Sequence, residues 1–286
     1  MIRPGASLDE HALDRMLDQV PRRGDVEVDL GAVEFVDPHG MVSLLELGRW
    51  LSREGRAAAL HEPHSDDVDG YLERMGFWAQ AARFFRDVEP RPAPRRGSDV
   101  LLEATPIERA ADVHAILARV RSRARAILAG HLGYDALAID RFLVALSEVC
   151  QNVLEHSGDV GFVAIQKYFY RESLGRNVVK IGVSDLGAGV RATLEGRLGR
   201  LSSDLDALDK AVLQGVSRHG DPGRGHGLRA VRETVVAWEG KLSARSGAGR
   251  LSLLPSWARG KAREARIAPF PGTQLFLTLP ALTLPH

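Results

Sequence analysis

Two hydrophobic periods alternate along the N-terminal third of the chain. Val26, Val28 and Leu30 alternate with acidic residues, which is typical of a half-buried strand. A helix is expected from Pro38, because proline suits the first helical turn and apolar residues follow at helical spacing. The pattern thus predicts a helix over 8–20 capped by Ser7, a strand over 26–30, an apolar run over 33–37, the helix from Pro38, a strand over 56–60 and a helix over 68–75. This order implies a small sheet covered by helices.

The remaining chain begins with helices and continues with strands. The strongest helical pattern covers 137–156, where apolar residues recur every three or four positions. We expect strands over 99–104, 161–168, 178–184, 241–246, 251–254 and 273–279, and further helices over 108–128 and 225–238. The stretch 191–216 is a polar connection with one helical part. These elements predict an α/β sandwich with a mixed, mostly antiparallel sheet and helices on one face.

A proline- and arginine-rich segment separates the two parts. Residues 89–98 contain three prolines and three arginines and almost nothing apolar, so they cannot offset the entropy cost of joining a core. We therefore expect a domain over 1–88, a linker over 89–98 and a second domain over 99–286.

Composition and charge exclude several functional classes. The 38 Lys+Arg nearly balance the 37 Asp+Glu, so no global field attracts nucleic acid or an anionic membrane. The single cysteine, Cys150, excludes an internal disulfide and a multi-cysteine zinc site. Neither a signal peptide nor a run of about 20 apolar residues is found. We expect a cytoplasmic protein that binds neither nucleic acid nor membrane.

Three segments carry candidate chemistry. On the helix over 137–156, Glu148, Asn152 and His156 lie one turn apart on the polar side, where a carboxylate and a carboxamide can contact one ligand. Asp185 ends a predicted strand and is followed by Gly187 and Gly189, which leave the backbone open to close approach. Taken singly, the first segment is better explained as a solvated helix face, and the second can be any tight turn.

The third segment is a glycine run at a predicted helix start. Gly223, Gly225 and Gly227 alternate with Arg224 and His226 and are followed by Leu228. Successive amide N–H groups at a helix N-terminus favour phosphate. The run is neither a Walker loop nor a Rossmann fingerprint, and a glycine hinge remains the alternative.

Four motifs follow one another along the chain: Glu-x-x-x-Asn, Asp-x-Gly-x-Gly, Gly-x-Gly-x-Gly-Leu and a late Gly272-Thr273. With these motifs in this order, the chain resembles the Bergerat-fold (GHKL) ATPases over about residues 99–280. The resemblance implies ATP and magnesium as cofactors. It implies that Asn152 binds magnesium, that Glu148 activates the attacking oxygen and that Asp185 accepts the adenine amino group. It further implies that Gly187 and Gly189 flank the base, that Thr273 supports it, and that residues 190–222 form a lid. The glycine run would bind phosphates through Gly223, Gly225, His226, Gly227 and Leu228.

Within that superfamily the chain resembles the anti-sigma factor serine kinases. Their pattern at this helix is Ser-Glu-x-x-x-Asn-x-x-x-His, and it is matched by Ser147, Glu148, Asn152 and His156. The resemblance implies that His156 also belongs to the nucleotide site. Residues 25–86 resemble STAS domains, the fold of anti-sigma factor antagonists. In those domains an Asp-Ser-Ser-Gly turn takes the phosphate, and here the turn reads Asp37-Pro38-His39-Gly40, without the acceptor hydroxyl.

These resemblances imply a STAS-like regulatory module fused to an ATP-binding domain. The implied activity is transfer of the ATP γ-phosphate to a partner protein, either a STAS-domain protein or a sigma-factor-like regulator. The alternative is an ATP-gated interaction scaffold without kinase activity. A homodimer is left open, as are the identity of the partner and the role of a module with His39 in place of serine.

Overall fold

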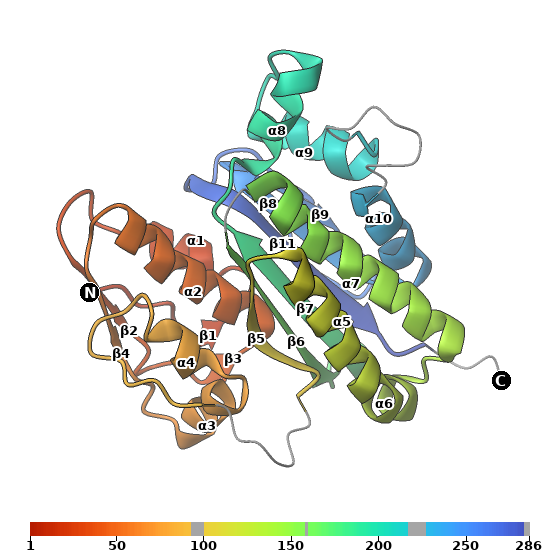
Figure 1. Ribbon diagram of the computed structural model, residues 1–286, viewed down its shortest axis with the longest axis horizontal. Coiled ribbons are helices and arrows are strands. Elements are labelled where there is room, and N and C mark those ends of the chain that lie inside the picture. Colours follow the sequence, from red (N-terminus) through yellow and green to blue (C-terminus); the bar gives the residue numbers. More distant parts are fainter. Residues whose placement is uncertain (93–99, 158–159, 217–226, 283–286) are drawn as a thin grey trace.

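The protein is a mixed α/β structure built around one large antiparallel sheet (Figure 1). The computed structural model describes residues 1–92, 100–157, 160–216 and 227–282. The sheet has seven strands in the order β10-β9-β8-β11-β7-β6-β5. All of its neighbouring strands pair antiparallel. Their bounds are β5 (Leu102–Ile107), β6 (Gly161–Tyr170), β7 (Arg176–Asp185), β8 (Lys241–Gly247), β9 (Gly249–Leu253), β10 (Arg263–Glu264) and β11 (Phe270–Pro280).

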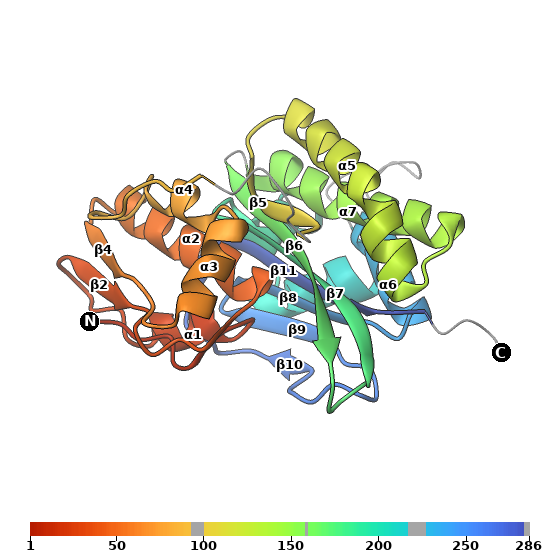
Figure 2. The ribbon, with the colours of Figure 1, turned by 90° about the horizontal axis from the view of Figure 1, so that it is seen from below.

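Both faces of this sheet carry buried apolar side chains, and both are covered. Along β6, Val163 and Ile165 belong to one hydrophobic core, and Phe162 and Ala164 belong to a second. Since successive side chains of a strand point to opposite faces, the two cores lie on either side of the sheet. Figure 2 shows the sheet between these two layers.

Helices of the C-terminal part cover the first face. They are α5 (Ala110–Ala124), α7 (Ala136–Ser157) and α10 (Gly227–Ala237), with α7 packed between the other two. The predicted helix over 108–128 continues from α5 through a π-helical turn, η1 (Arg125–Ala129), into α6 (Gly130–Leu132). The predicted helix over 137–156 is confirmed within one residue at each end.

The N-terminal segment covers the second face, which the sequence pattern did not predict. Its longest helix, α2, packs against β6 and β7, and its apolar residues share a core with Phe162 and Phe276. The elements are β1 (Ser7–Leu8), α1 (Ala12–Leu17), β2 (Val26–Asp29), β3 (Phe35–Val36), α2 (Pro38–Arg53), β4 (Ala58–His61), α3 (Asp66–Arg74) and α4 (Phe77–Ala81). Strands β2 and β4 pair in parallel, as do β1 and β3.

The start of α2 is as predicted, whereas the start of α1 is not. Asp37 caps α2 by accepting a hydrogen bond from the Gly40 N–H, and Pro38 is its first residue. The helix predicted over 8–20 with Ser7 as its cap is wrong. Ser7 and Leu8 form a strand beside Phe35 and Val36, and the helix covers only Ala12–Leu17. Leu8 is fully buried in that strand, so it contributes to the core without joining the helix.

The polar connection over 191–216 is more helical than predicted. It contains α8 (Gly189–Leu198), α9 (Asp204–Leu208) and the π-helical turn η2 (Asp209–Leu213). Leu194, Leu201, Ala207 and Ala211 form a small core of their own, and α9 packs on β8 and β9. The predicted lid over 190–222 is thus a packed helical segment as far as residue 216, and its remainder lies outside the described residues.

Only the beginning of the predicted linker over 89–98 is described. There Arg91 forms ion pairs with Asp69 and Glu62, and its guanidinium lies 4.5 Å from the centre of the Trp78 ring. This part of the segment is therefore attached to the N-terminal elements. Among the described helices, none has the length and apolar character needed to cross a membrane.

Candidate functional site

Asp185 lies at the end of β7, on the sheet face covered by α7. Along β7 it follows Ile181 and Val183 at every second position, so its side chain points to the same face. The side chains of Ile181 and Val183 belong to the core under the helices. Its Oδ1 accepts a hydrogen bond of 2.7 Å from the Gly187 N–H, which fixes the direction of the carboxylate. The side chain is only 6% exposed. The turn after β7 therefore holds a buried carboxylate in one orientation.

Thr273 lies beside Asp185 on the neighbouring strand. Gln274 of β11 pairs with Ser184 of β7. Because the two strands are antiparallel, Thr273, which precedes Gln274, lies next to Asp185, which follows Ser184. Thr273 also continues the positions of Leu275 and Leu277, which belong to the same core as the α7 residues. The two predicted adenine-binding side chains thus lie on one face at one end of the sheet.

Helix α7 crosses this same end of the sheet. A Cβ atom on Gly161, which pairs with Asp185, would lie 2.6 Å from Val153 Cγ1, so the helix rests directly on the start of β6. Asn152 immediately precedes Val153, and Glu148 lies one turn before Asn152. Both are half-buried at the side of the core stripe, whereas Glu155 is exposed. The predicted polar face is thus partly covered.

Asn152 has hydrogen-bonding capacity that the described residues do not use. Its buried Nδ2 atom has no hydrogen-bond partner among them. A buried polar atom without a partner costs about 1–3 kcal/mol, so such an atom in a folded protein calls for an explanation. A ligand group that accepts a hydrogen bond from this amide, such as a phosphate oxygen, would supply one.

The glycines around Asp185 have a packing role as well as the predicted nucleotide role. Gly189 has φ +76°, and a Cβ there would lie 2.8 Å from Ser246 Oγ. At Gly272, with φ +74°, a Cβ would lie 2.0 Å from the Asp185 carbonyl oxygen. Ser246 Oγ accepts from the Val190 N–H and donates to the Gly272 carbonyl. Both glycines are therefore required for the β7 turn to pack against β8 and β11.

The predicted phosphate-binding run is described only at its end. Gly223, Gly225 and His226 lie outside the described residues, as does the side chain of His156. Gly227 is the first residue of α10, and Leu228 packs against the core shared with α7. The run therefore leads into α10, which packs on α7, the helix that carries Asn152.

The described residues offer few ligands for a metal ion held by protein side chains alone. They contain no group of three or more His, Cys, Asp or Glu side chains that could hold a metal ion. Asn152 could contribute one oxygen ligand to magnesium, and magnesium commonly takes its other ligands from phosphates and water. The donor set thus suits magnesium delivered together with a nucleotide.

A second polar centre joins the N-terminal segment to the other face of the sheet. Asp37, fully buried at the start of α2, forms an ion pair with Lys180 of β7. Burial alone would raise the pKa of Asp37, but the charge of Lys180 and the hydrogen bonds that the carboxylate accepts from Lys180 and Gly40 act together against it, so this pKa lies below its usual value. Conversely, burial alone would lower the pKa of Lys180, but the charge of Asp37 and the interactions with Asp37 and Tyr170 act together against it, so the lysine pKa lies above its usual value. Both groups are charged at neutral pH.

Further ion pairs cross the same boundary. Glu10 binds Lys241 of β8, and Asp14 of α1 binds both Arg245 and Arg250. Arg245 is 0% exposed, and burial lowers its pKa to about 10. Within the described residues, the N-terminal segment is therefore bound to the sheet by charged contacts as well as apolar ones.

These partners were missed by the sequence analysis. Lys180 could have been found, because it interrupts the apolar run Val178–Val183 in a strand expected to be buried. A lysine is almost never fully buried unless it is paired, so its position signals a partner carboxylate. Nothing in the sequence pattern identifies Asp37 as that partner.

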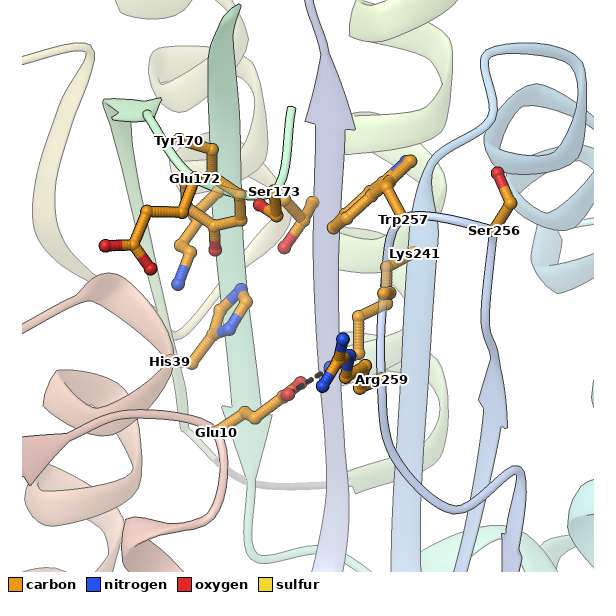
Figure 3. Close-up of a pocket in the computed structure, with 12 residues that line it drawn as sticks. Glu10, His39, Tyr170, Glu172, Ser173, Lys241, Ser256, Trp257 and Arg259 are labelled. Atoms are coloured by element: carbon orange, nitrogen blue, oxygen red, sulfur yellow. Dashed lines mark hydrogen bonds and ion pairs between the residues drawn. The ribbon is translucent and has the colours of Figure 1, made fainter. Parts of the chain in front are cut away.

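A cavity of about 690 Å³ opens beside this second centre (Figure 3). Its walls include Glu10 and His39 from the N-terminal segment, Lys180 and Lys241 from the sheet, and the loop 256–259. It lies on the sheet face opposite to Asp185 and Asn152, since Thr278 of β11, which also lines it, points away from the side of Leu277 and Leu279. It is therefore separate from the predicted nucleotide site.

Known proteins add no assignment to this geometry. Comparison with the models of known protein families gives no match, and comparison with curated proteins gives none either.

Proposed function

We propose that the protein is an ATP-binding regulator that resembles the anti-sigma factor serine kinases and transfers the ATP γ-phosphate to a hydroxyl of a partner protein. Residues 99–286 would form a Bergerat-type ATP-binding domain, and residues 1–88 would form a STAS-like regulatory module. The partner class is a STAS-domain protein or a sigma-factor-like regulator.

One observation carries the proposal. The buried carboxylate of Asp185, Thr273 beside it and the unpartnered Nδ2 of Asn152 belong to elements that meet at one end of the sheet. These residues lie far apart in sequence, on α7, on the β7 turn and on β11. A solvated helix face would leave Asn152 in water, whereas its amide nitrogen is buried.

The roles follow from the chemistry of each group. Asp185, oriented by the Gly187 N–H, would accept a hydrogen bond from the adenine amino group. Asn152 would hold magnesium through its carboxamide oxygen, and the ion when bound would neutralise charge on the phosphates. Glu148, one turn earlier on α7, would accept the proton of the attacking hydroxyl. The glycine run before α10 would bind phosphate oxygens through its amides.

An ATP-gated scaffold is the second candidate. The contacts of α2 with the turn after β7 favour it: Leu186, which follows Asp185, packs in the core of the N-terminal segment, and Arg53 donates to the Leu186 carbonyl oxygen. Nucleotide bound to Asp185 would therefore act on a segment that touches the N-terminal module. Such coupling needs no phosphate transfer.

Radiolabel transfer and nucleotide affinity, measured together, test the proposal. The purified chain is incubated with magnesium and γ-labelled ATP, with and without a STAS-domain protein, and ATP affinity is measured by calorimetry. Label on the added protein together with measurable affinity supports the kinase. Affinity without transfer to any hydroxyl supports the scaffold, and the absence of magnesium-dependent ATP binding overturns both.

A further inference from the structure

The cavity on the second face of the sheet has the size of a small-molecule site. Its volume of about 690 Å³ falls within the range of about 300–1,000 Å³ that is usual for ligand pockets. Figure 3 shows Glu10 and His39 on one side, the strands of the sheet behind, and Trp257 and Arg259 across from them. The N-terminal segment and the sheet both contribute walls, so a bound molecule would contact both.

His39 lines this cavity and has a buried ring nitrogen without a hydrogen-bond partner among the described residues. Its ring is 2% exposed and stacks on Phe276, with ring centres 4.8 Å apart. Nε2 lies 3.2 Å from the Leu277 carbonyl oxygen, which can only accept, so Nε2 carries the proton. Burial lowers the pKa of His39, and Asp37 offsets this only in part, which keeps the ring neutral. Nδ1 is then a bare lone pair, buried and without a partner among the described residues.

The opposite side of the cavity carries positive charge. Lys241 uses one ammonium hydrogen on Glu10 and has two more. Arg259 is exposed, and no ion pair or hydrogen bond of its guanidinium occurs within the described residues. Lys180 is engaged by Asp37 and lies 5.3 Å from the centre of the Tyr170 ring. The other carboxylate, Glu172, lies in the exposed β6–β7 hairpin, across the cavity from Arg259 (Figure 3).

Aromatic rings form part of the remaining wall. Tyr170 and Trp257 meet edge to face, with ring centres 6.1 Å apart. The Trp257 indole N–H donates to the Glu239 carbonyl oxygen, so its polar edge is already satisfied and its ring offers apolar surface. A ligand with a carbon skeleton is therefore favoured over a bare inorganic ion.

We propose that this cavity binds a small organic anion that carries a hydroxyl group. The anionic group would lie against Arg259 and Lys241, the hydroxyl would donate to His39 Nδ1, and the carbon skeleton would contact Trp257. By touching both the N-terminal segment and the sheet, the ligand stabilises their association. The site is independent of the nucleotide site on the opposite face.

Thermal melting of the full chain without nucleotide tests the site with matched probes. Malate is compared with succinate and citrate with tricarballylate, pairs that differ only in the hydroxyl, and glucose 6-phosphate is compared with inorganic phosphate. Ligand that binds the folded state raises the melting temperature. We expect at least one hydroxylated anion to do so at millimolar concentration, and its matched comparator to bind about tenfold more weakly.

Variants identify the location. Arg259→Gln changes an exposed side chain and should weaken the bound anion about tenfold, whereas Arg266→Gln, exposed and outside the cavity, should not. His39→Leu, where circular dichroism shows it folded, should bind both members of a pair equally. The proposal is overturned if no hydroxylated anion of the panel shifts the melting temperature, or if Arg259→Gln binds as tightly as the unaltered chain. Asn152→Ala should leave this binding intact.

Discussion

At the scale of one residue, Asn152 distinguishes between two hypotheses for α7, a ligand site and an ordinary helix face. Its buried Nδ2 has no partner among the described residues, so replacing it by alanine removes no internal hydrogen bond of that atom. Alanine also has the highest helix propensity. We predict that Asn152→Ala keeps the melting temperature of the unaltered chain and lowers magnesium-dependent ATP affinity at least about tenfold, measured by calorimetry.

Gln151 provides the matched control for that prediction. It is the neighbouring residue of α7, exposed, and its amide donates to Ser147 Oγ. Gln151→Ala should bind ATP normally. Equal affinity of the Asn152 and Gln151 variants would remove Asn152 from the site.

Glu148 tests chemistry separately from binding. Glu148→Gln keeps the shape and hydrogen-bonding capacity of the side chain but removes the basic carboxylate. General-base groups contribute about 100- to 10,000-fold to rate, so we predict near-normal ATP affinity and a loss of turnover of that size. The exposed Glu155→Gln, on the same helix, is the control. If the unaltered chain and Glu148→Gln turn over ATP equally slowly, the scaffold function is supported over the kinase.

At the scale of elements, the buried Asp37–Lys180 pair connects the start of α2 to β7. Asp37→Asn retains a capping side chain for Gly40 and removes only the charge. Breaking one side of a buried pair typically costs about 3–5 kcal/mol, because the remaining charge is buried alone. We predict that loss for Asp37→Asn, and for Lys180→Met, in the free energy of unfolding from denaturant titration. The double variant should lose less than the sum.

The same pair predicts a pH dependence. The folded-state pKa of Asp37 is lowered, so its contribution is present above the unfolded-state value of about 3.9 and is lost as the pH falls through the folded-state pKa. The pKa of Lys180 is raised, so its contribution is present below about 10.4 and is lost at higher pH. Between these limits the penalty of Asp37→Asn should be constant. The exposed pair Asp25–Arg86 is the control, and Asp25→Asn should cost less than about 1 kcal/mol.

Periodicity predicted the long elements because their burial is regular. The apolar stripe of α7 and the start of α2 at Pro38 follow from spacing and from proline chemistry. The two-residue strands β1 and β10 are too short to show a period. Helix α9 and the turn η2 were not located within the polar connection because they bury few side chains: Ala207 and Ala211 join a separate small core, and Leu208 and Val212 join the core under α7.

Pairing between distant elements was harder to predict from the sequence. The pattern shows that β6 and β11 have apolar residues on both faces, but it does not show that α2 covers one of them. The candidate nucleotide residues were found because their order resembles a known motif. Glu10, Lys180 and Lys241 belong to no such motif and were missed, although the position of Lys180 inside an apolar strand marks it as paired.

At the scale of the whole molecule, the N-terminal segment and the sheet share one buried boundary. The core of that segment includes Phe162, Leu186 and Phe276 of the C-terminal part. The Asp37-Pro38-His39-Gly40 turn lies inside the boundary: a Cβ on Gly182 of β7 would lie 2.6 Å from the Pro38 carbonyl oxygen. The turn that resembles the phosphate-accepting turn of STAS domains therefore lies here in a buried contact.

This burial predicts that the N-terminal module is not phosphorylated in the folded chain. Phosphate transfer requires an accessible acceptor, whereas His39 is 2% exposed and Ser43, one turn further along α2, is fully buried. A phosphate on Ser43 would also place about two negative charges in the packed interior of this boundary. We expect the purified protein, incubated with magnesium and ATP, to carry no phosphate within residues 1–90. Mass spectrometry that preserves both phosphoserine and acid-labile phosphohistidine measures this, with a denatured sample as control for detection of the same peptides. Stoichiometric phosphate on His39 or Ser43 would mean that the boundary opens during turnover and that the fusion switches itself.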